Sequence, residues 1–239
     1  PKTPRKWKQL GNLNIINIKS VKNNYKNIFN EFKKINQRGP DSTKKVKIKN
    51  YTAMFHRLSI IDLKTRSNQP MLSSCKRYLL TYNGEIYNFI ELRKYLKDIG
   101  VKFKTKSDSE VILNGFKKEG AKFVKNLRGM FAFTIWDNKE EKLYVFRDRL
   151  GQKPLYYFKG ENEIVIASEI KYIKLIINNL KINYKTAHNF IVNANLDENN
   201  ETFFKEVLKV PAATYFVIQN NKIVKKKYWF LKLSEKKHF

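Results

Sequence analysis

The segment Leu79–Leu92, with the sequence LLTYNGEIYNFIEL, constrains the fold of this chain most strongly. Its first four residues are apolar, polar β-branched or aromatic, which is typical of a β-strand. Asn83-Gly84 readily adopts positive φ, so we expect the strand to end there in a tight turn. From Phe89 onward apolar residues recur at helical spacing, and Gly100 ends the pattern. The sequence therefore predicts a strand, a turn and a helix in succession.

Three neighbouring residues in this turn carry polar groups that can contact a ligand. Asn83 offers a side-chain amide, Gly84 an unshielded backbone N–H and Glu85 a carboxylate. An amide beside a backbone N–H forms the donor pair of an oxyanion hole. The alternative interpretation is that Asn-Gly serves the turn alone. This segment by itself leaves both interpretations open.

The composition is that of a globular protein with a substantial core. Of 239 residues, 42% are hydrophobic and 14% aromatic. No apolar run reaches the roughly 20 residues that span a bilayer, and the N-terminal PKTPRKWKQ lacks the apolar segment of a secretory signal. Cys75 is the one cysteine, so an intrachain disulfide is excluded. These features predict a reducing, cytoplasmic setting and no membrane partner.

The formal net charge of +28 suggests a second hypothesis, which is binding to nucleic acid or another polyanion. Two observations weaken it. Lysine greatly outnumbers arginine, although arginine makes the bidentate contacts to phosphates and bases. The lysines are also scattered, apart from the short run Lys225–Lys227. We therefore favour a solvated, basic surface.

Strand and helix patterns alternate along the rest of the chain. Strands are predicted at 13–18, between 46 and 58, and at 130–136, 142–146, 155–158, 164–167, 214–218 and 222–227. Helices are predicted at 24–36, from the capping box Ser107–Glu110 to Glu119, and from a Ser168 cap to Ile177. Antiparallel hairpins with interposed helices predict one α+β layered domain over residues 10–230. We expect a basic arm at 1–9, an irregular insertion near 178–200 and a tail at 231–239.

Eight motifs occur together in a fixed order. They are RGPD at 38–41, HRLSIIDL at 56–63, QPM at 69–71, YNGEIYN at 82–88, SDSEV at 107–111, LRGMFAFTIWD at 127–137, RDRLGQKPLYY at 147–157 and SEIK at 168–171. As an ordered set, they closely resemble the class II glutamine amidotransferase domain of glutamine-hydrolysing asparagine synthetase. The resemblance runs from about Leu10 to Trp229. It implies a four-layer αββα sandwich of the N-terminal-nucleophile hydrolase type, in which two antiparallel sheets lie between helices.

The resemblance also implies a site for glutamine, which the family converts to glutamate plus ammonia for asparagine formation. Arg57 matches the arginine that pairs with the glutamine α-carboxylate, a partner that suits a guanidinium fork. Asn83 and Gly84 match the oxyanion-hole donors, and Asp108 matches the carboxylate that holds the α-ammonium. The other matched positions are Glu85 and the pocket-lining segment of Leu58, Ser59, Ile60 and Ile61.

Two of these residues have alternative structural roles. Arg57 could form a surface salt bridge or cover apolar surface with its stem. Asp108 lies in the first turn of a predicted helix, where the helix dipole favours a carboxylate. Taken with the whole set of motifs, the sequence favours the glutamine pocket, with the structural roles added to it.

The sequence departs from the family at the nucleophile. The family uses an N-terminal cysteine, whose thiol attacks the amide while its own α-amine takes the proton. Here Leu10 aligns with that cysteine and carries no nucleophile. Cys75 precedes Asn83 by eight residues, which corresponds to roughly 25 Å of extended chain. His56, His188 and His238 fit neither a catalytic triad nor a metal-ligand spacing.

The sequence also lacks the Ser-Gly-Gly loop with which the synthetase half of the family binds the pyrophosphate of ATP. We therefore predict no cofactor and no metal in this chain, and ATP with Mg only where a separate synthetase half exists. The leading hypothesis is a degenerate domain that binds glutamine or serves as a scaffold for a synthetase-domain partner. One alternative is an active amidotransferase within a longer or two-chain enzyme. The other is a basic protein that binds polyanions on the same fold.

Overall fold

Two antiparallel sheets form the centre of the computed structural model, which describes residues 11–17, 25–37, 39–57, 65–194 and 199–231. The first sheet contains, in spatial order, β10 (Val207–Lys209), β8 (Tyr156–Lys159), β9 (Glu163–Ala167), β1 (Gly11–Asn17), β3 (Tyr51–Arg57) and β2 (Ser42–Ile48). The second contains β12 (Lys222–Lys227), β11 (Thr214–Gln219), β7 (Lys142–Arg147), β6 (Gly129–Asp137), β5 (Tyr78–Ile86) and β4 (Met71–Leu72).

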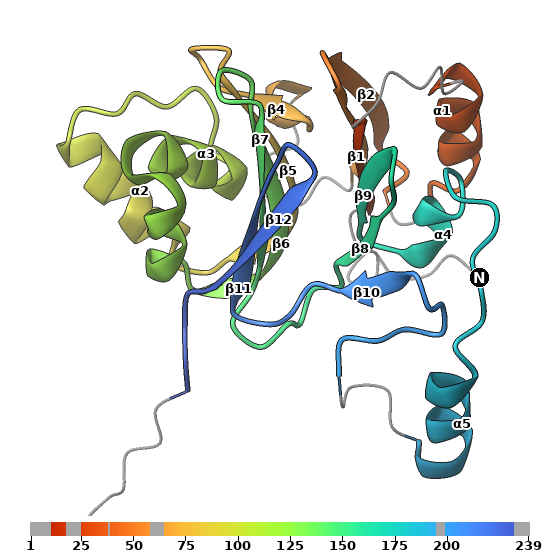
Figure 1. The fold of residues 1–239 in the computed structure, drawn as a ribbon. Helices are drawn as coiled ribbons and strands as arrows, with labels where there is room; N and C mark the ends of the chain where they lie inside the picture. Colours follow the sequence, from red (N-terminus) through yellow and green to blue (C-terminus); the bar gives the residue numbers. More distant parts are fainter. Residues whose placement is uncertain (1–10, 18–24, 38, 58–64, 195–198, 232–239) are drawn as a thin grey trace, which may run out of the picture.

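Helices cover the outer face of each sheet (Figure 1). The first sheet carries α1 (Tyr25–Lys34) and the short α4 (Ile170–Ile173). The second carries α2 (Phe89–Asp98) and α3 (Asp108–Glu119), followed by the 3₁₀ turn Gly120–Asn126. A second 3₁₀ turn spans Thr65–Ser67. This layering confirms the predicted αββα sandwich, because each sheet is apolar on both faces and needs a covering layer on each.

Side chains along a strand alternate between the two faces, and this alternation divides the core into layers. Leu79 and Trp136 belong to the core between the sheets, where the Tyr51 and Trp136 rings stack 4.8 Å apart. Leu80, Tyr82 and Ile86 pack instead under α2 and α3. Leu13 and Ile15 of β1 face α1 and α4. The even-numbered positions of β1, including Asn12 and Asn14, therefore face the other sheet.

The predicted turn at Asn83-Gly84 is wrong. β5 continues to Ile86 and pairs with β6 from Tyr78↔Asp137 to Ile86↔Gly129. At Gly84, where φ is +155°, a Cβ atom would lie 2.2 Å from the carbonyl oxygen of Met130. Glycine is required here because the two strands approach closely, rather than because the chain reverses.

The two helices after β5 begin and end near the predicted residues. α2 begins at Phe89, and Gly100 follows it with φ +85°. α3 begins at Asp108, and the Ser107 hydroxyl accepts a hydrogen bond from the Glu110 N–H at 3.4 Å. The Glu110 carboxylate does not complete the capping box, because it accepts hydrogen bonds from the Lys104 and Thr105 N–H groups.

Three further predictions differ from the structure. Ser168 does not cap α4: its hydroxyl accepts a hydrogen bond from the Asn12 N–H at 3.0 Å, and α4 ends at Ile173. The segment near 178–200 is not wholly irregular, because it contains α5 (Tyr184–Asn193), capped by the Asn183 side chain. The short strand β10 was not predicted. None of the described helices is long and apolar enough to cross a membrane.

Candidate functional site

The free edge of β5 exposes a backbone N–H at Gly84. The Gln69 side chain occupies this edge at Tyr82, donating to its carbonyl at 3.1 Å and accepting from its N–H at 2.6 Å. The Ile86 N–H donates to the Asp108 carboxylate at 3.2 Å. Between these two anchored residues lies Gly84. Because backbone polar groups of alternate residues point to the same side of a strand, the Gly84 N–H points to this edge as well.

The opposite strand supports this assignment. Phe131 of β6 faces Gly84, but its N–H and C=O both bond to Asp148, at 3.2 and 2.8 Å. Gly84 and Phe131 therefore form a non-hydrogen-bonded pair, the class in which facing Cα atoms come closest. β6 thus leaves the Gly84 N–H available to a ligand.

Asn83 places a second donor next to this N–H. Its side chain lies on the inter-sheet face and is 1% exposed, and its Nδ2 has no hydrogen-bond partner among the described residues. A buried donor without a partner costs about 1–3 kcal/mol, so this amide is a candidate for ligand binding. Two adjacent N–H donors can stabilise a carbonyl oxygen on which negative charge develops.

A buried polar network lies between the sheets, one inward-facing position before Asn83 on β5. Asn14 Oδ1 accepts hydrogen bonds from Tyr51 OH at 2.7 Å, Thr81 at 3.1 Å and Thr134 at 3.2 Å. Beyond this network, the next inter-sheet side chains are Asn83 on β5 and Asn12 on β1. Asn12 is fully buried, and neither polar atom of its side-chain amide has a partner within the part of the chain that the structure describes. Asn12 lies just before the strand predicted at 13–18, and none of the eight motifs includes it, so it was not predicted as a site residue.

Arg57 ends β3 on the same inter-sheet face, two positions beyond Phe55, the residue that pairs with Asn12. It is 8% exposed and donates to the Asn68 side chain. The RGPD motif packs against this strand end: the Asp41 N–H donates to the Arg57 carbonyl at 3.1 Å. A Cβ on Gly39 would lie 2.5 Å from the carbonyl carbon of His56. The motif therefore holds the backbone of the arginine in place.

Asp108 approaches β5 from the helix-covered face. It is 4% exposed and accepts hydrogen bonds from Tyr82 OH at 2.7 Å and from the Ile86 N–H. Burial raises the pKa of the Asp108 carboxyl above its ordinary value, although these hydrogen bonds oppose the shift. The structure thus assigns Asp108 a positioning role at the end of β5. Glu85 is half-buried at the neighbouring strand position. Leu10, Leu58, Ser59, Ile60 and Ile61 lie outside the described residues.

Cys75 lies in the exposed turn between β4 and β5. A hydrogen bond from the Ser73 side chain, 3.3 Å away, lowers the pKa of its thiol. This turn precedes Tyr78, and β5 is extended from there to Asn83, about 16 Å at 3.3 Å per residue. Cys75 therefore lies at the other end of the strand from the donor pair. Within the described ranges, no group of three His, Cys, Asp or Glu side chains could hold a metal.

The fold agrees with comparisons to known proteins. Residues 12–229 match the glutamine amidotransferase domain family, and the chain belongs to this family. Asparagine synthetase [glutamine-hydrolyzing] 1 of Bacillus subtilis is 36% identical over 182 residues, covering 76% of this chain and 28% of that protein. The putative asparagine synthetase 2 of Methanocaldococcus jannaschii is 32% identical over 225 residues, covering 86% and 43% respectively.

Solved structures support the fold independently. The glutamine phosphoribosylpyrophosphate amidotransferase of B. subtilis superposes with a TM-score of 0.65 over 92% of this chain and 50% of that one, at 18% sequence identity. This likeness confirms the sandwich of the N-terminal-nucleophile type. The chain spans less than half the length of these two asparagine synthetases. The family match begins at residue 12, so the alignment of Leu10 with the nucleophile stays a prediction.

Proposed function

We propose that this chain is an amidotransferase-type domain that binds glutamine without hydrolysing it. The observation that carries the proposal is the unpartnered, buried Asn83 Nδ2 beside the outward-pointing Gly84 N–H. In this arrangement the glutamine side-chain carbonyl accepts from both donors. The Arg57 guanidinium receives the α-carboxylate, because a planar fork matches a planar carboxylate.

The hydrolytic step needs a nucleophile that this sequence does not supply near the donor pair. A thioester mechanism requires a thiolate to attack the amide carbon while ammonia leaves. Cys75 is the one cysteine in the sequence, and β5 separates it from Asn83. With the donors kept and the thiol absent, binding occurs without turnover. A synthetase domain acting with this chain would then use free ammonia.

The relatives support asparagine formation as the context of this domain. Both synthetases named above are described as glutamine-hydrolysing. We propose that a synthetase domain is the partner of this chain, and that the bound glutamine regulates or stabilises that partner. ATP and Mg would be bound by the partner domain.

Isothermal titration with glutamine, paired with a glutamate-release assay on the same preparation, tests the proposal. We expect measurable binding and no glutamate above the blank. Asn83→Ala and Arg57→Ala should each weaken binding at least about tenfold, because each removes a hydrogen bond to a charged or polarised group worth about 1.5–3 kcal/mol. Arg128→Ala, at an exposed arginine on the loop before β6, is the matched control and should bind like the wild type.

Two results would contradict the proposal. Absence of binding in a folded wild-type chain would leave a scaffold role. Glutamate release would favour the active alternative, and Cys75→Ser would then show whether that thiol carries the reaction. Circular dichroism of each variant separates loss of binding from loss of fold.

A further inference from the structure

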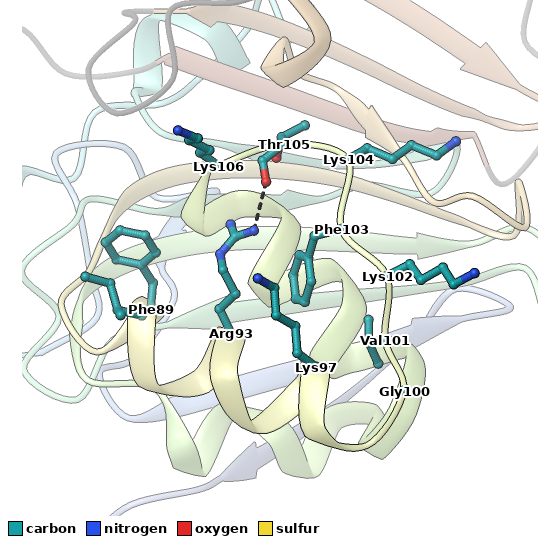
Figure 2. A pocket seen from close by; sticks show the side chains of 11 residues that line it. Phe89, Arg93, Lys97, Gly100, Val101, Lys102, Phe103, Lys104, Thr105 and Lys106 are labelled. Atoms are coloured by element: carbon teal, nitrogen blue, oxygen red, sulfur yellow. Dashed lines mark hydrogen bonds between the residues drawn. The ribbon is translucent and has the colours of Figure 1, made fainter.

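A groove lies between α2 and the extended segment 101–106 that leads towards α3, on the outer face of the second sheet (Figure 2). Five cationic residues line it: Arg93, Lys97, Lys102, Lys104 and Lys106. The remaining lining residues are apolar, aromatic or neutral, and none is acidic. Neither the proposed glutamine site nor the sequence motifs account for this groove.

Arg93 gives the groove a fixed centre. Its guanidinium donates to the Thr105 carbonyl at 2.8 Å and to the Ser107 carbonyl at 2.7 Å. It also lies over the Phe103 ring, 4.4 Å from the ring centroid. Figure 2 shows Arg93, Phe103 and Phe89 side by side along the groove. These contacts tie α2 to segment 101–106, so the aromatic and cationic floor is held in place before any ligand binds.

Three of the lysines around this centre extend into solvent. Lys97, Lys102 and Lys104 are exposed, and no carboxylate of the described residues forms an ion pair with them. Asp108 and Glu110, the two acids that follow Lys104, are both buried. Asp108 is bonded to Tyr82 and Ile86, and Glu110 to backbone N–H groups and the Thr105 hydroxyl. The groove therefore carries uncompensated positive charge that attracts an anion.

The positive charge extends beyond one groove. Lys102 also lines a second hollow, whose other cationic residues are Lys117 and Lys118 of α3. No acidic residue lines this second hollow. The two hollows share Gly100, Val101 and Lys102, so the cations form a continuous track across the segment. A track fits a polymer with repeated charges better than a single small anion.

We propose that this track binds a phosphodiester backbone, as found in nucleic acid, without sequence preference. Phosphates would contact the lysines on the rim, and flat bases would lie against the Phe89, Arg93 and Phe103 floor. Single-stranded nucleic acid is bound by this combination of cations and aromatic rings. An acidic peptide matches the charge but offers carboxylates without flat rings for the floor.

Fluorescence anisotropy with a labelled oligothymidylate of about 20 nucleotides tests the proposal. We expect affinity to fall steeply between about 50 and 200 mM salt. The triple variant Lys97→Gln, Lys102→Gln, Lys104→Gln should bind about tenfold more weakly at low salt. Its slope of log K against log salt should be shallower by about 2, because each phosphate contact to a single strand contributes about 0.7.

The matched control removes the same charge elsewhere. This control is a triple variant of exposed lysines on β2 and β12: Lys44→Gln, Lys222→Gln, Lys226→Gln. It should keep most of the affinity and slope. Ile90→Glu, at a position 67% exposed on the groove rim, should weaken binding by repulsion without altering the core.

Equal losses in both triple variants would overturn the proposed location, because binding would then follow net charge alone. Tighter binding to polyglutamate than to oligothymidylate would assign the track to an acidic protein instead. A duplex of the same length, measured in parallel, shows whether the bases contribute. None of these variants touches Asn83 or Arg57, so glutamine binding should be unchanged in all of them.

Discussion

At the scale of single residues, burial gives the polar side chains of this protein their roles. Among the described residues, the amide nitrogens of Asn12, Asn14 and Asn83 all lack a hydrogen-bond partner, but the Asn14 Oδ1 accepts from three hydroxyls whereas the Asn12 Oδ1 has no partner. Neighbouring asparagines on one strand therefore differ in function: Asn14 joins the two sheets, and Asn12 lies one step nearer the proposed ligand. Asp108 holds Tyr82 and the end of β5, which keeps the Gly84 N–H in position.

His56 is a second example, and it leads to a prediction. Its ring stacks on Phe32 at 3.9 Å, its Nε2–H donates to the Phe32 carbonyl, and its Nδ1 accepts from the Thr43 hydroxyl. Burial lowers the pKa of His56 from 6.5 to about 4, and the charge of Lys171 adds to this. The unfolded chain therefore takes up a proton at a higher pH than the folded chain.

The contribution of His56 to stability is complete above pH 6.5 and is lost as the pH falls towards 4. We expect this loss to reach about 3 kcal/mol at the acid end of that window. Urea unfolding at several pH values measures it. His56→Gln should flatten this part of the profile, whereas His188→Gln, at an exposed helical position, should not. An unchanged profile in His56→Gln would contradict the assignment.

At the scale of elements, β5 is the strand on which the site depends. Its pairing with β6 extends through Ile86, and Gln69 and Asp108 hold its other edge on either side of Gly84. The loop after β7 is held in a similar way. Arg147 donates to the carbonyls of Gly151, Lys153 and Val210, at 2.6, 2.9 and 2.6 Å. The motifs QPM and RDRLGQKPLYY therefore each supply a side chain that forms hydrogen bonds to the backbone: Gln69 to β5, and Arg147 to the loop after β7.

Gly84→Ala tests the close strand approach. The new Cβ would lie 2.2 Å from the Met130 carbonyl oxygen and 2.7 Å from the Phe131 Cα, both of them backbone atoms. We expect a loss of about 3 kcal/mol in the free energy of unfolding, from overpacking together with an unfavourable φ. Gly100→Ala has the same kind of φ but no neighbour within 4 Å, and should cost only about 1 kcal/mol. Equal losses in the two variants would refute the steric explanation.

At the scale of the whole molecule, two sheets enclose one apolar layer and each is covered by helices (Figure 1). The central strands β1 and β3 are buried along their whole length, and the exposed lysines lie mainly on the helices, loops and edge strands. The edge strands β2 and β12 carry lysines, which hinder pairing with another chain. The net charge of +28 is thus concentrated on the surface of a compact fold.

Such a charge destabilises the compact state by self-repulsion. We therefore expect the melting temperature to rise between about 20 and 300 mM sodium chloride, because salt screens exposed charges. Differential scanning calorimetry measures the change. The triple lysine-to-glutamine variants, with less repulsion, should gain less from salt. A melting temperature that falls with salt would show that surface ion pairs outweigh the repulsion.

The sequence by itself determined most of the elements and the family. Apolar periodicity located β1, α1, α2, α3 and the hairpins, because burial requires those side chains at those spacings. The ordered motifs identified the class of domain, and several of them form contacts that hold the fold, such as Gln69 on β5 and Arg147 on the loop after β7. Arg57, Asn83, Gly84 and Asp108 were found in this way, although their roles with glutamine stay predictions.

Only the tertiary structure decided the local geometry around those residues. Asn-Gly indicates a turn when it is considered alone, but pairing with β6 imposes a strand there, because nine paired residues outweigh a two-residue preference. The helix α5 was missed because its pattern contains few apolar residues that the sandwich buries. Asn12 and the groove at Arg93 were also invisible in the sequence. The surroundings of Asn12 come from strands far apart in the chain, which only packing brings together. The groove is built from residues 89–106 alone, and it forms because the segment after α2 folds back along that helix.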